Sequence, residues 1–394
     1  MIPAVPGALD GLRVLDLSWG IAGSLGVLML AEQGADVIKV EPPGGDPFRD
    51  YSGYAVWNRS RRSVTLDLKH PEGQAAFHKL AAGADVLVET FRPGVTDRLG
   101  IGFDALHAEN PRLVYCSCPA YPEGHRLAAE PGYDALVQAA SGQQWEQPGW
   151  RLGPIFLHMP MPSMAAMFLV PTGILAALIA REDTGRGQHV RTSLLQGAYL
   201  YTTQIWTWAE KAPGDFWTIM SKSYPAGSHQ EMLFEVANDD WVHMSIMSGL
   251  PAIRSQDDIL GVDVEASNNE RYAMLSEEER AQITPLRKAA YLQQQRDELI
   301  AAFRENNHAM EAIVPMGDSL GGGPSGEPHP QLAANGMVAT VDDPELGSTT
   351  QVGVPIHLAG TPGGIQGPRP TPGQHNDEIL GELGYAAVDL KAFT

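Results

Sequence analysis

A glycine-containing turn near the start of the chain could hold a phosphate-bearing cofactor. The turn "WGIAGS" (19–24) follows the apolar segment "LRVLDLS" (12–18), and Glu41 ends the next apolar segment. A strand, a glycine turn, a helix and an acid at the end of a second strand are parts of a dinucleotide site. Only Gly20 and Gly23 are present, so the G-x-G-x-x-G pattern is not met. We therefore expect no nicotinamide or flavin cofactor.

A second group of residues that could do chemistry is the pair Cys116 and Cys118, the only cysteines of the chain. In the strand-like segment "LVYCSCPAY" side chains two residues apart share one face, and no further metal ligands are nearby. We interpret them as buried thiols of a reducing cytoplasm and predict no metal site.

A third feature is a turn without an acid. Residues 158–163 contain no Asp or Glu and lead into a long apolar run, 164–180. Ser163 could serve there as a helix N-cap whose hydroxyl accepts from a backbone N–H, or as a nucleophile; the absence of an adjacent base favours the cap. The run is short for a membrane span and is interrupted by Pro171 and Gly173, so a buried core helix is expected.

The elements that would position these residues alternate between strand and helix over the first two hundred positions. Segments 12–18 and 37–43 have the pattern of strands, and 24–36 has that of a helix. The same order returns in "EGQAAFHKLAAGADVLVETFRPG" and "FDALHAENPRLVYCSC". Repeated helix and strand units predict a mostly parallel sheet covered on both faces, which is an α/β domain.

The composition changes after about residue 205. "MLFEVANDDWVHMSIM" predicts a hairpin that turns at 238–240, and acidic, Gln-rich helices follow. Gly321 to Gly323 lack the Lys and Ser/Thr of a phosphate loop and favour a hinge. The chain is thus predicted to have a large domain (1–205), a small α+β domain with the hairpin and helices (206–328), and a C-terminal segment that returns to the large domain (329–394).

Charge excludes some classes of partner. The 394 residues carry a formal net charge of −20, which argues against a nucleic-acid or anionic-membrane surface. Any anionic ligand must meet a local cluster of cations. The start "MIPAVPGALDG" has neither a basic nor an apolar run, so we expect no secretory signal and a cytoplasmic location.

Several segments, in order along the chain, resemble the family III coenzyme A transferases, the CaiB/BaiF-like proteins that include formyl-CoA transferase and 2-methylacyl-CoA racemases. They are "GLRVLDLS", "GADVIKVEPPGGDPFR", "NRSRRSVTLDLKHPEGQ", "ADVLVETFRPGVTDRLGIGFDAL", "PGYDALVQAASG", "TGILAALIAREDTGRGQHV" and "TPGQHNDEILGELGY". The resemblance is weakest from about 205 to 330. It implies a Rossmann-like large domain, a small domain and two chains interlocked as rings, with coenzyme A or acyl-CoA as substrate and no permanently bound cofactor.

Matching positions imply residues that contact CoA. They are Leu66, Lys69, Thr90, Phe91 and Arg98. CoA carries a 3′-phosphate and a diphosphate, which need cations and backbone donors.

Three further residues complete the predicted set. Arg61 and Arg62 add local charge beside Arg59 and Arg92, and Tyr133 stands where racemases carry a His. The alternative is that these arginines are solvated or pair with carboxylates.

Transferase chemistry in the family, as the resemblance implies it, uses an Asp at the start of the long apolar helix to form an acyl anhydride. That position falls on Ser163, or on Pro162 or Met161, and none of these is acidic. The usual racemase pair of His and Asp is missing as well. Among possible substitutes, Asp134 is the best candidate, and His158 and Glu146 are near in sequence.

Three hypotheses follow. The chain is an acyl-CoA:carboxylate CoA-transferase that works alone through another group, or a silent CoA-binding subunit, or a CoA-dependent isomerase or lyase. A silent subunit would pair with a homologous chain that carries the Asp. We therefore expect a homodimer or a heteromer.

Overall fold

The computed structural model describes residues 6–144, 154–156, 158–201, 233–244, 251–262, 277–323 and 325–385. The chain divides into two compact units. The first comprises Met1–Gln147, Gly153–Thr203 and His329–Thr394, and the second Pro148–Leu152 and Gln204–Pro328.

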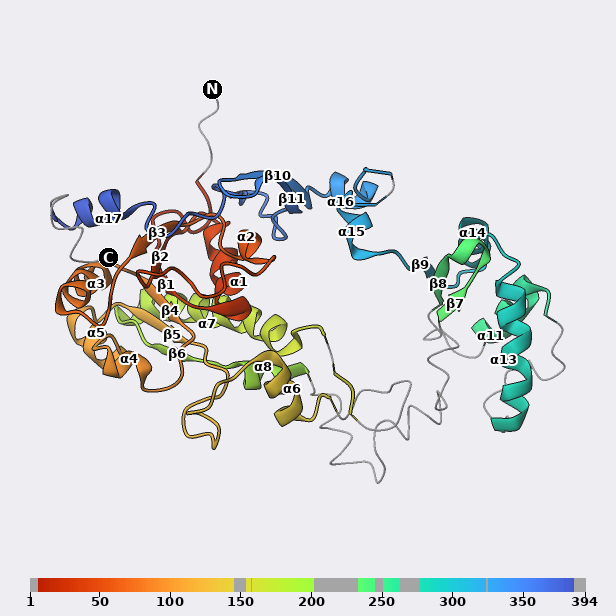
Figure 1. Ribbon diagram of the computed structural model, residues 1–394, viewed down its shortest axis with the longest axis horizontal. Helices are drawn as coiled ribbons and strands as arrows, with labels where there is room; N and C mark the ends of the chain where they lie inside the picture. Colours follow the sequence, from red (N-terminus) through yellow and green to blue (C-terminus); the bar gives the residue numbers. More distant parts are fainter. Residues whose placement is uncertain are drawn as a thin grey trace. The chain divides into compact units, whose positions relative to one another are not determined.

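A six-stranded sheet forms the centre of the first unit (Figure 1). Its strands are β1 (Arg13–Leu17), β2 (Asp36–Glu41), β3 (Arg62–Thr65), β4 (Val86–Glu89), β5 (Val114–Ser117) and β6 (His189–Arg191). They run parallel in the order β3-β2-β1-β4-β5-β6. This arrangement confirms the predicted mixed α/β fold with a parallel sheet, and it places the carboxyl ends of the strands along one edge.

The two faces of this sheet are covered by helices α1 (Gly20–Ala31), α3 (Pro71–Ala82), α5 (Phe103–Glu109) and α7 (Met161–Thr184). Further helices up to residue 201 are α2 (Tyr54–Trp57), α4 (Val95–Arg98), α6 (Asp134–Ser141) and α8 (Leu194–Tyr201). Apolar residues of α3 and α5 pack with Leu15, Leu87 and Tyr115 on one face. Residues of α1 and α7 pack with Val14 and Val88 on the other. Consecutive strand residues therefore point to opposite cores, which explains the unbroken apolar runs.

Helix α7 is buried on one face only. Ala166, Val170 and Ile174 lie in the core, whereas Phe168 and Ile179 are exposed. By length and composition α7 could cross a membrane, and one third of its most apolar window is buried. The predicted core helix is thus confirmed for the face that packs on the sheet.

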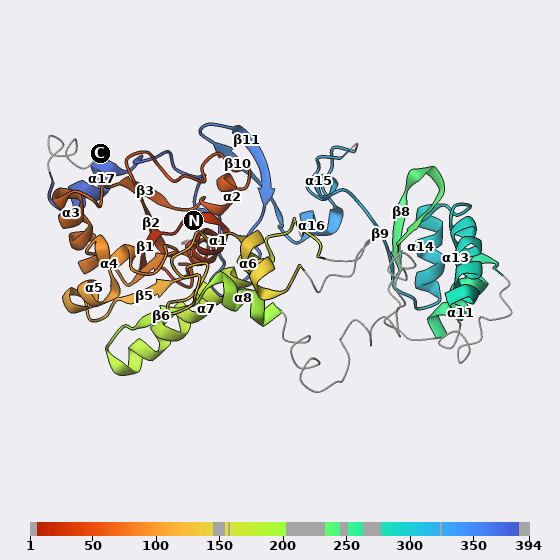
Figure 2. The ribbon, with the colours of Figure 1, turned by 60° about the horizontal axis from the view of Figure 1, so that its bottom comes forward.

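The C-terminal segment contains α16 (Pro330–Ala334), a hairpin of β10 (Val338–Asp343) and β11 (Gly347–Val352), and α17 (Asn376–Glu382). Ile379 and Leu380 of α17 join the core that contains α3. Figure 2 shows α17 beside β3 and α3. The last described part of the chain therefore belongs to the first unit.

The second unit contains a three-stranded sheet in the order β7-β8-β9. Its elements are β7 (Leu233–Glu235), β8 (Trp241–Met244), α11 (Pro251–Leu260), α13 (Glu277–Tyr291), α14 (Arg296–Glu305), β9 (Met310–Ala312) and α15 (Met316–Ser319). The predicted hairpin is confirmed, because β7 and β8 pair antiparallel around a turn in which Asn238 and Asp239 have positive φ.

One boundary differs from the prediction. Helix α1 begins at Gly20 rather than at Ser24, so most of "WGIAGS" is helical. Gly20 has a φ of 77°, which a residue with a side chain rarely adopts. The turn after β1 is therefore only two residues long.

Candidate functional site

The turns after β1 and β4 are joined at the carboxyl edge of the sheet. The Thr90 hydroxyl accepts from the Trp19 N–H at 2.8 Å and donates to the Trp19 carbonyl at 3.1 Å. The Trp19 and Phe91 rings meet edge to face with 5.1 Å between centroids. A side chain at Gly23 would collide with Ser18 and Thr90, since a Cβ there would lie 2.3 Å from the Ser18 Cβ. The close approach of the Ser18 and Thr90 side chains thus requires glycine at position 23.

Buried ion pairs lie beside the same edge of the sheet. The Lys39 ammonium donates to the Ser18 carbonyl at 2.7 Å and lies 2.9 Å from Asp46. Burial opposes ionisation of Asp16, but Lys39 and Arg61 outweigh it and hold the pKa of Asp16 below its usual value. The ends of β1 and β2 are therefore fixed by paired charges.

The structure brings part of the predicted CoA set together. Leu66, directly after β3, is buried in the cluster against which Phe91 packs. Lys69 and Arg98 are exposed, and neither head group forms an ion pair within the described part of the chain. These two cations are therefore free to meet a phosphate.

Arg61 and Arg62 require a correction. The Arg61 side chain is buried and binds Asp16 at 2.5 Å. Arg62 binds Asp36 at 2.7 Å, and it also binds Glu378. Because these head groups are occupied within the protein, the alternative that they pair with carboxylates describes them, and we leave them out of the proposed ligand contacts.

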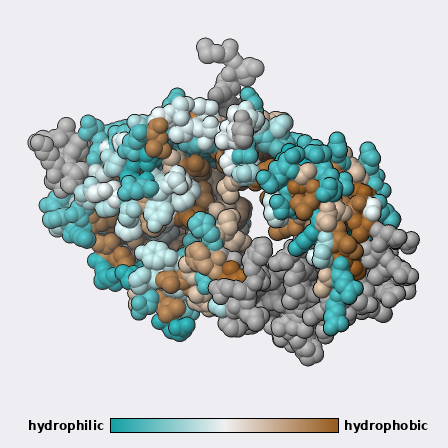
Figure 3. All heavy atoms as spheres, turned by 45° about the vertical axis from the view of Figure 1, so that its right-hand side comes forward, coloured by the Kyte–Doolittle hydropathy of each residue, from teal (hydrophilic) through white to brown (hydrophobic). Residues whose placement is uncertain are grey.

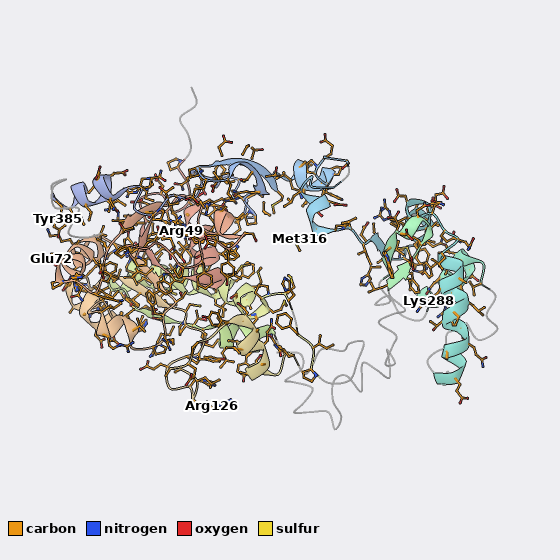
Figure 4. The ribbon with its side chains drawn as sticks, viewed as in Figure 1. Arg49, Glu72, Arg126, Lys288, Met316 and Tyr385 are labelled. Carbon is orange, nitrogen blue, oxygen red and sulfur yellow. The ribbon has the colours of Figure 1, made fainter. Side chains whose placement is uncertain are left out.

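Arg59 and Glu41 are also taken up by internal partners. Arg59 is buried against Glu32 at 2.6 Å. Glu41, at the place of a ribose-binding acid, accepts from Arg49 at 2.8 Å and from the Ser63 hydroxyl. Figure 4 labels Arg49 among the side chains of the first unit. In this arrangement Glu41 serves packing rather than a ligand.

Asp134 and Ser163 meet at the start of the long helix. The carboxylate of Asp134, the first residue of α6, accepts from the Ser163 N–H at 2.8 Å through Oδ1 and from the Ser163 hydroxyl at 2.8 Å through Oδ2. Burial raises the pKa of Asp134 and outweighs these two hydrogen bonds, which lower it. A carboxylate thus stands at the helix start although the turn itself contains no acid.

The predicted N-cap role of Ser163 is wrong. Helix α7 begins at Met161 with Pro160 as N-cap, so Ser163 lies inside the first turn. Its hydroxyl donates to Asp134 instead of accepting from the backbone. The backbone N–H of Ser163 has no partner within its own helix, and it donates to Asp134 of α6 instead of to a local cap.

Two other candidates near Asp134 do not share its partly buried position. His158 and Tyr133 are exposed, Tyr133 by 60% of its surface. Tyr133 is the N-cap residue of α6 and directly precedes Asp134. Glu146 lies outside the described residues.

Glu89, the last residue of β4, is a residue that the sequence reading missed. The residue is 5% exposed, and its carboxylate accepts from the Phe91 N–H at 2.7 Å. Its neighbour on β5, Ser117, lowers the pKa of Glu89, and the Ser117 hydroxyl lies 2.9 Å from His189 Nε2. Burial raises the pKa of Glu89 to about 7. Its position directly before the "TFRPG" turn could have identified it in the sequence as a residue of the site.

Both cysteines are buried and free, as predicted. Burial raises the pKa of Cys118 to about 12, so its thiol is unreactive at neutral pH. Among the described residues no three His, Cys, Asp or Glu side chains are grouped to hold a metal ion.

Comparison with known proteins finds relatives of this chain among the CoA-transferases. The chain is 38% identical to the acetyl-CoA:oxalate CoA-transferase of Acetobacter aceti over 229 residues, which span 54% of this chain and 58% of that relative. It is 29% identical to the succinyl-CoA–D-citramalate CoA-transferase of Chloroflexus aurantiacus over 98% of this chain and 96% of the relative.

Solved structures show the same fold. The crystal structure of Rv3272 from Mycobacterium tuberculosis matches 95% of this chain and 100% of its own, with a TM-score of 0.78 and 24% identity. A CAIB/BAIF family protein from Brucella suis matches with a TM-score of 0.78 and 23% identity. The model of CoA-transferase family III matches residues 9–376. The chain therefore belongs to CoA-transferase family III.

Proposed function

We propose that this protein transfers coenzyme A between an acyl-CoA donor and a carboxylic acid acceptor. The observation that carries the proposal is the Asp134 carboxylate, which stands against the first turn of α7 through two hydrogen bonds to Ser163. Relatives named as CoA-transferases for oxalate and citramalate support the reaction class. The substrate class is therefore an acyl-CoA together with a free acid.

CoA would bind along the carboxyl edge of the sheet. Thr90 and Phe91, directly after β4, are partly exposed and offer a surface for CoA, whereas the Leu66 side chain after β3 is buried and would meet CoA only through its backbone. Lys69 and Arg98 offer charges for the phosphates. Tyr133 lies beside Asp134, where it could contact the acyl end.

Asp134 would act as the nucleophile. Its carboxylate oxygen attacks the thioester carbonyl, the C–S bond breaks, and CoA leaves as the thiolate while an acyl–aspartyl anhydride forms. A carboxylate suits this step because the anhydride is as activated as the thioester, so transfer to the acceptor acid remains possible. The raised pKa of Asp134 makes its carboxylate more basic and therefore more nucleophilic.

Trapping of the anhydride tests the proposal. The purified chain is mixed with acyl-CoA and then with hydroxylamine, which converts an aspartyl anhydride or thioester to a hydroxamate. We expect peptide mass spectrometry to find the hydroxamate at Asp134 and not in the D134N variant. Acyl-CoA turnover without an acceptor acid would instead indicate an isomerase or lyase.

A second candidate is a CoA-binding subunit that is silent by itself. It is supported by the same pair, since each oxygen of Asp134 already accepts a hydrogen bond and residues 161–163 contain no acid. In that case Asp134 orients the helix start, and a homologous chain supplies the nucleophile. We propose for either case a cytoplasmic dimer, with a copy or a homologue, in the interlocked form that the family resemblance implies.

A further inference from the structure

Glu89, Ser117 and His189 lie on the neighbouring strands β4, β5 and β6 under the proposed CoA edge. Glu89 pairs with Ser117 in register between β4 and β5, and Tyr115 of β5 pairs with His189 of β6. Glu89 and Ser117 are thus neighbours across the two strands, and the Ser117 hydroxyl lies 2.9 Å from His189 Nε2. His189 is partly exposed and stacks on Phe103 with 4.7 Å between centroids. Ser117 thus lies between a buried carboxyl and a ring that solvent can reach.

No cation compensates Glu89 within the described residues. The titratable groups that face it are Asp97 of α4, the Tyr115 hydroxyl and the Cys116 and Cys118 thiols of β5, and His189 through Ser117. Asp97 disfavours a second negative charge, and the thiols and phenol are neutral near pH 7. An ionised Glu89 is therefore stabilised only by hydrogen bonds.

The location of Glu89 connects this charge to the ligand. Its oxygen holds the Phe91 N–H, so it sets the backbone of the turn that carries Thr90 and Phe91. CoA brings several negative charges to this edge, and an uncompensated carboxylate beneath them is repelled in a medium of low dielectric constant. A neutral acid avoids the repulsion and still accepts from Phe91.

We propose that Glu89 is a positioning residue for CoA that takes up one proton when CoA binds. The inference rests on the proposed function. The proton comes from solvent by way of His189 and Ser117: His189 Nε2–H donates to Ser117 and Ser117 to Glu89 in the ionised state, and the order reverses in the neutral state. No bond other than O–H and N–H bonds is made or broken.

Proton uptake is measured by isothermal titration calorimetry of CoA binding in buffers of different ionisation enthalpy. Because the pKa of Glu89 is about 7, the free protein is about half protonated there at pH 7. We expect an uptake of about half a proton at pH 7 that approaches one at pH 8, with CoA binding weakening as the pH rises.

The Glu89→Gln variant should bind CoA with no pH-dependent uptake from this site, and Glu305→Gln, an exposed carboxylate of the second unit, should match the unmodified protein. The 3′-phosphate of CoA titrates near pH 6 and appears equally in all three proteins. Equal proton counts in Glu89→Gln and the unmodified protein would overturn the inference. No CoA binding by the unmodified protein would contradict the proposed function itself and the inference with it.

Infrared difference spectra of the unmodified protein give a second test that does not depend on folding of a variant. Addition of CoA at pH 8 should produce the carbonyl band of a protonated carboxyl group. Its absence would contradict proton uptake at Glu89. In Ser117→Ala the band should remain, but the rate of uptake should fall because the link to His189 is broken.

Discussion

At the scale of single residues, the Asp134–Ser163 pair decides how the start of α7 is held. Two donors of Ser163 are satisfied by one carboxylate from α6. The contact joins residues 29 positions apart. Sequence reasoning could name both residues because each matches a family position, but their hydrogen bonds depend on how α6 packs against α7, which no local pattern contains.

Removal of the Ser163 hydroxyl tests this contact. Ser163→Ala should lower the free energy of unfolding by about 1–2 kcal/mol, because a partly buried carboxylate oxygen loses its donor. Urea unfolding at pH 7 measures the change. Ser24→Ala is the matched control, since the Ser24 hydroxyl is buried and has no partner among the described residues. A loss as large in Ser24→Ala would show that the Asp134 contact is not the cause.

Glu89 predicts a pH dependence of stability. Its pKa rises from 4.5 in the unfolded chain to about 7 in the folded protein. The folded state therefore favours the neutral acid, and this contribution is complete below about pH 4.5 and is lost as the pH rises through 7. The shift corresponds to about 3 kcal/mol.

The Glu89→Gln variant should remove that loss. Its stability relative to the unmodified protein should increase between pH 5 and pH 8, and thermal or urea unfolding at several pH values measures it. A constant difference across this range would mean that Glu89 does not titrate there. The result depends on no ligand, so it separates the charge of Glu89 from its role in binding.

At the scale of elements, the parallel sheet was predictable because its strands are short apolar runs bounded by Gly or Pro. In β4, Leu87 packs in one core, and Val86 and Val88 pack in the other. Because both faces of the strand are buried, its apolar run is continuous and easy to recognise. Helix starts were harder to place. Gly20 begins α1 in a conformation that its sequence neighbours do not require, and Met161 begins α7 without a side-chain cap.

Close packing of α1 on α7 gives a prediction about Gly26. A Cβ at this position would lie 2.9 Å from the Val170 Cβ and 3.1 Å from the Met167 carbonyl oxygen. Gly26→Ala should therefore destabilise the protein by about 1–3 kcal/mol despite the better helix propensity of alanine. Gly381→Ala in α17 is the control, because nothing lies within 4 Å of the added carbon. It should be neutral or slightly stabilising, and a similar loss at both sites would contradict the packing argument.

At the scale of the whole molecule, α7 presents an apolar stripe. Phe168, Leu175 and Ile179 are exposed, Ile179 by 71% of its surface, and their spacing of seven and four residues places them on one face of the helix. Figure 3 shows that apolar residues gather in patches on the surface of the described chain. Patches of this kind mark surfaces that another molecule covers. Sequence patterns predicted an apolar helix, but not which of its faces is left uncovered by the fold.

We predict that a second protein chain covers this stripe. Light scattering should show a dimer for the unmodified protein and a monomer for a variant that combines Phe168→Asp and Ile179→Glu, whereas Glu182→Gln, an exposed change on the same helix, should leave the dimer intact. Native isolation from the source cells, with mass spectrometry of every co-purifying chain, then identifies the second chain. A homologue with an acid in the first turn of its long helix would assign the nucleophile to that partner. A copy of the same chain would leave Asp134 as the carboxylate at the site, and a monomer that binds lipid vesicles would contradict a protein partner on α7.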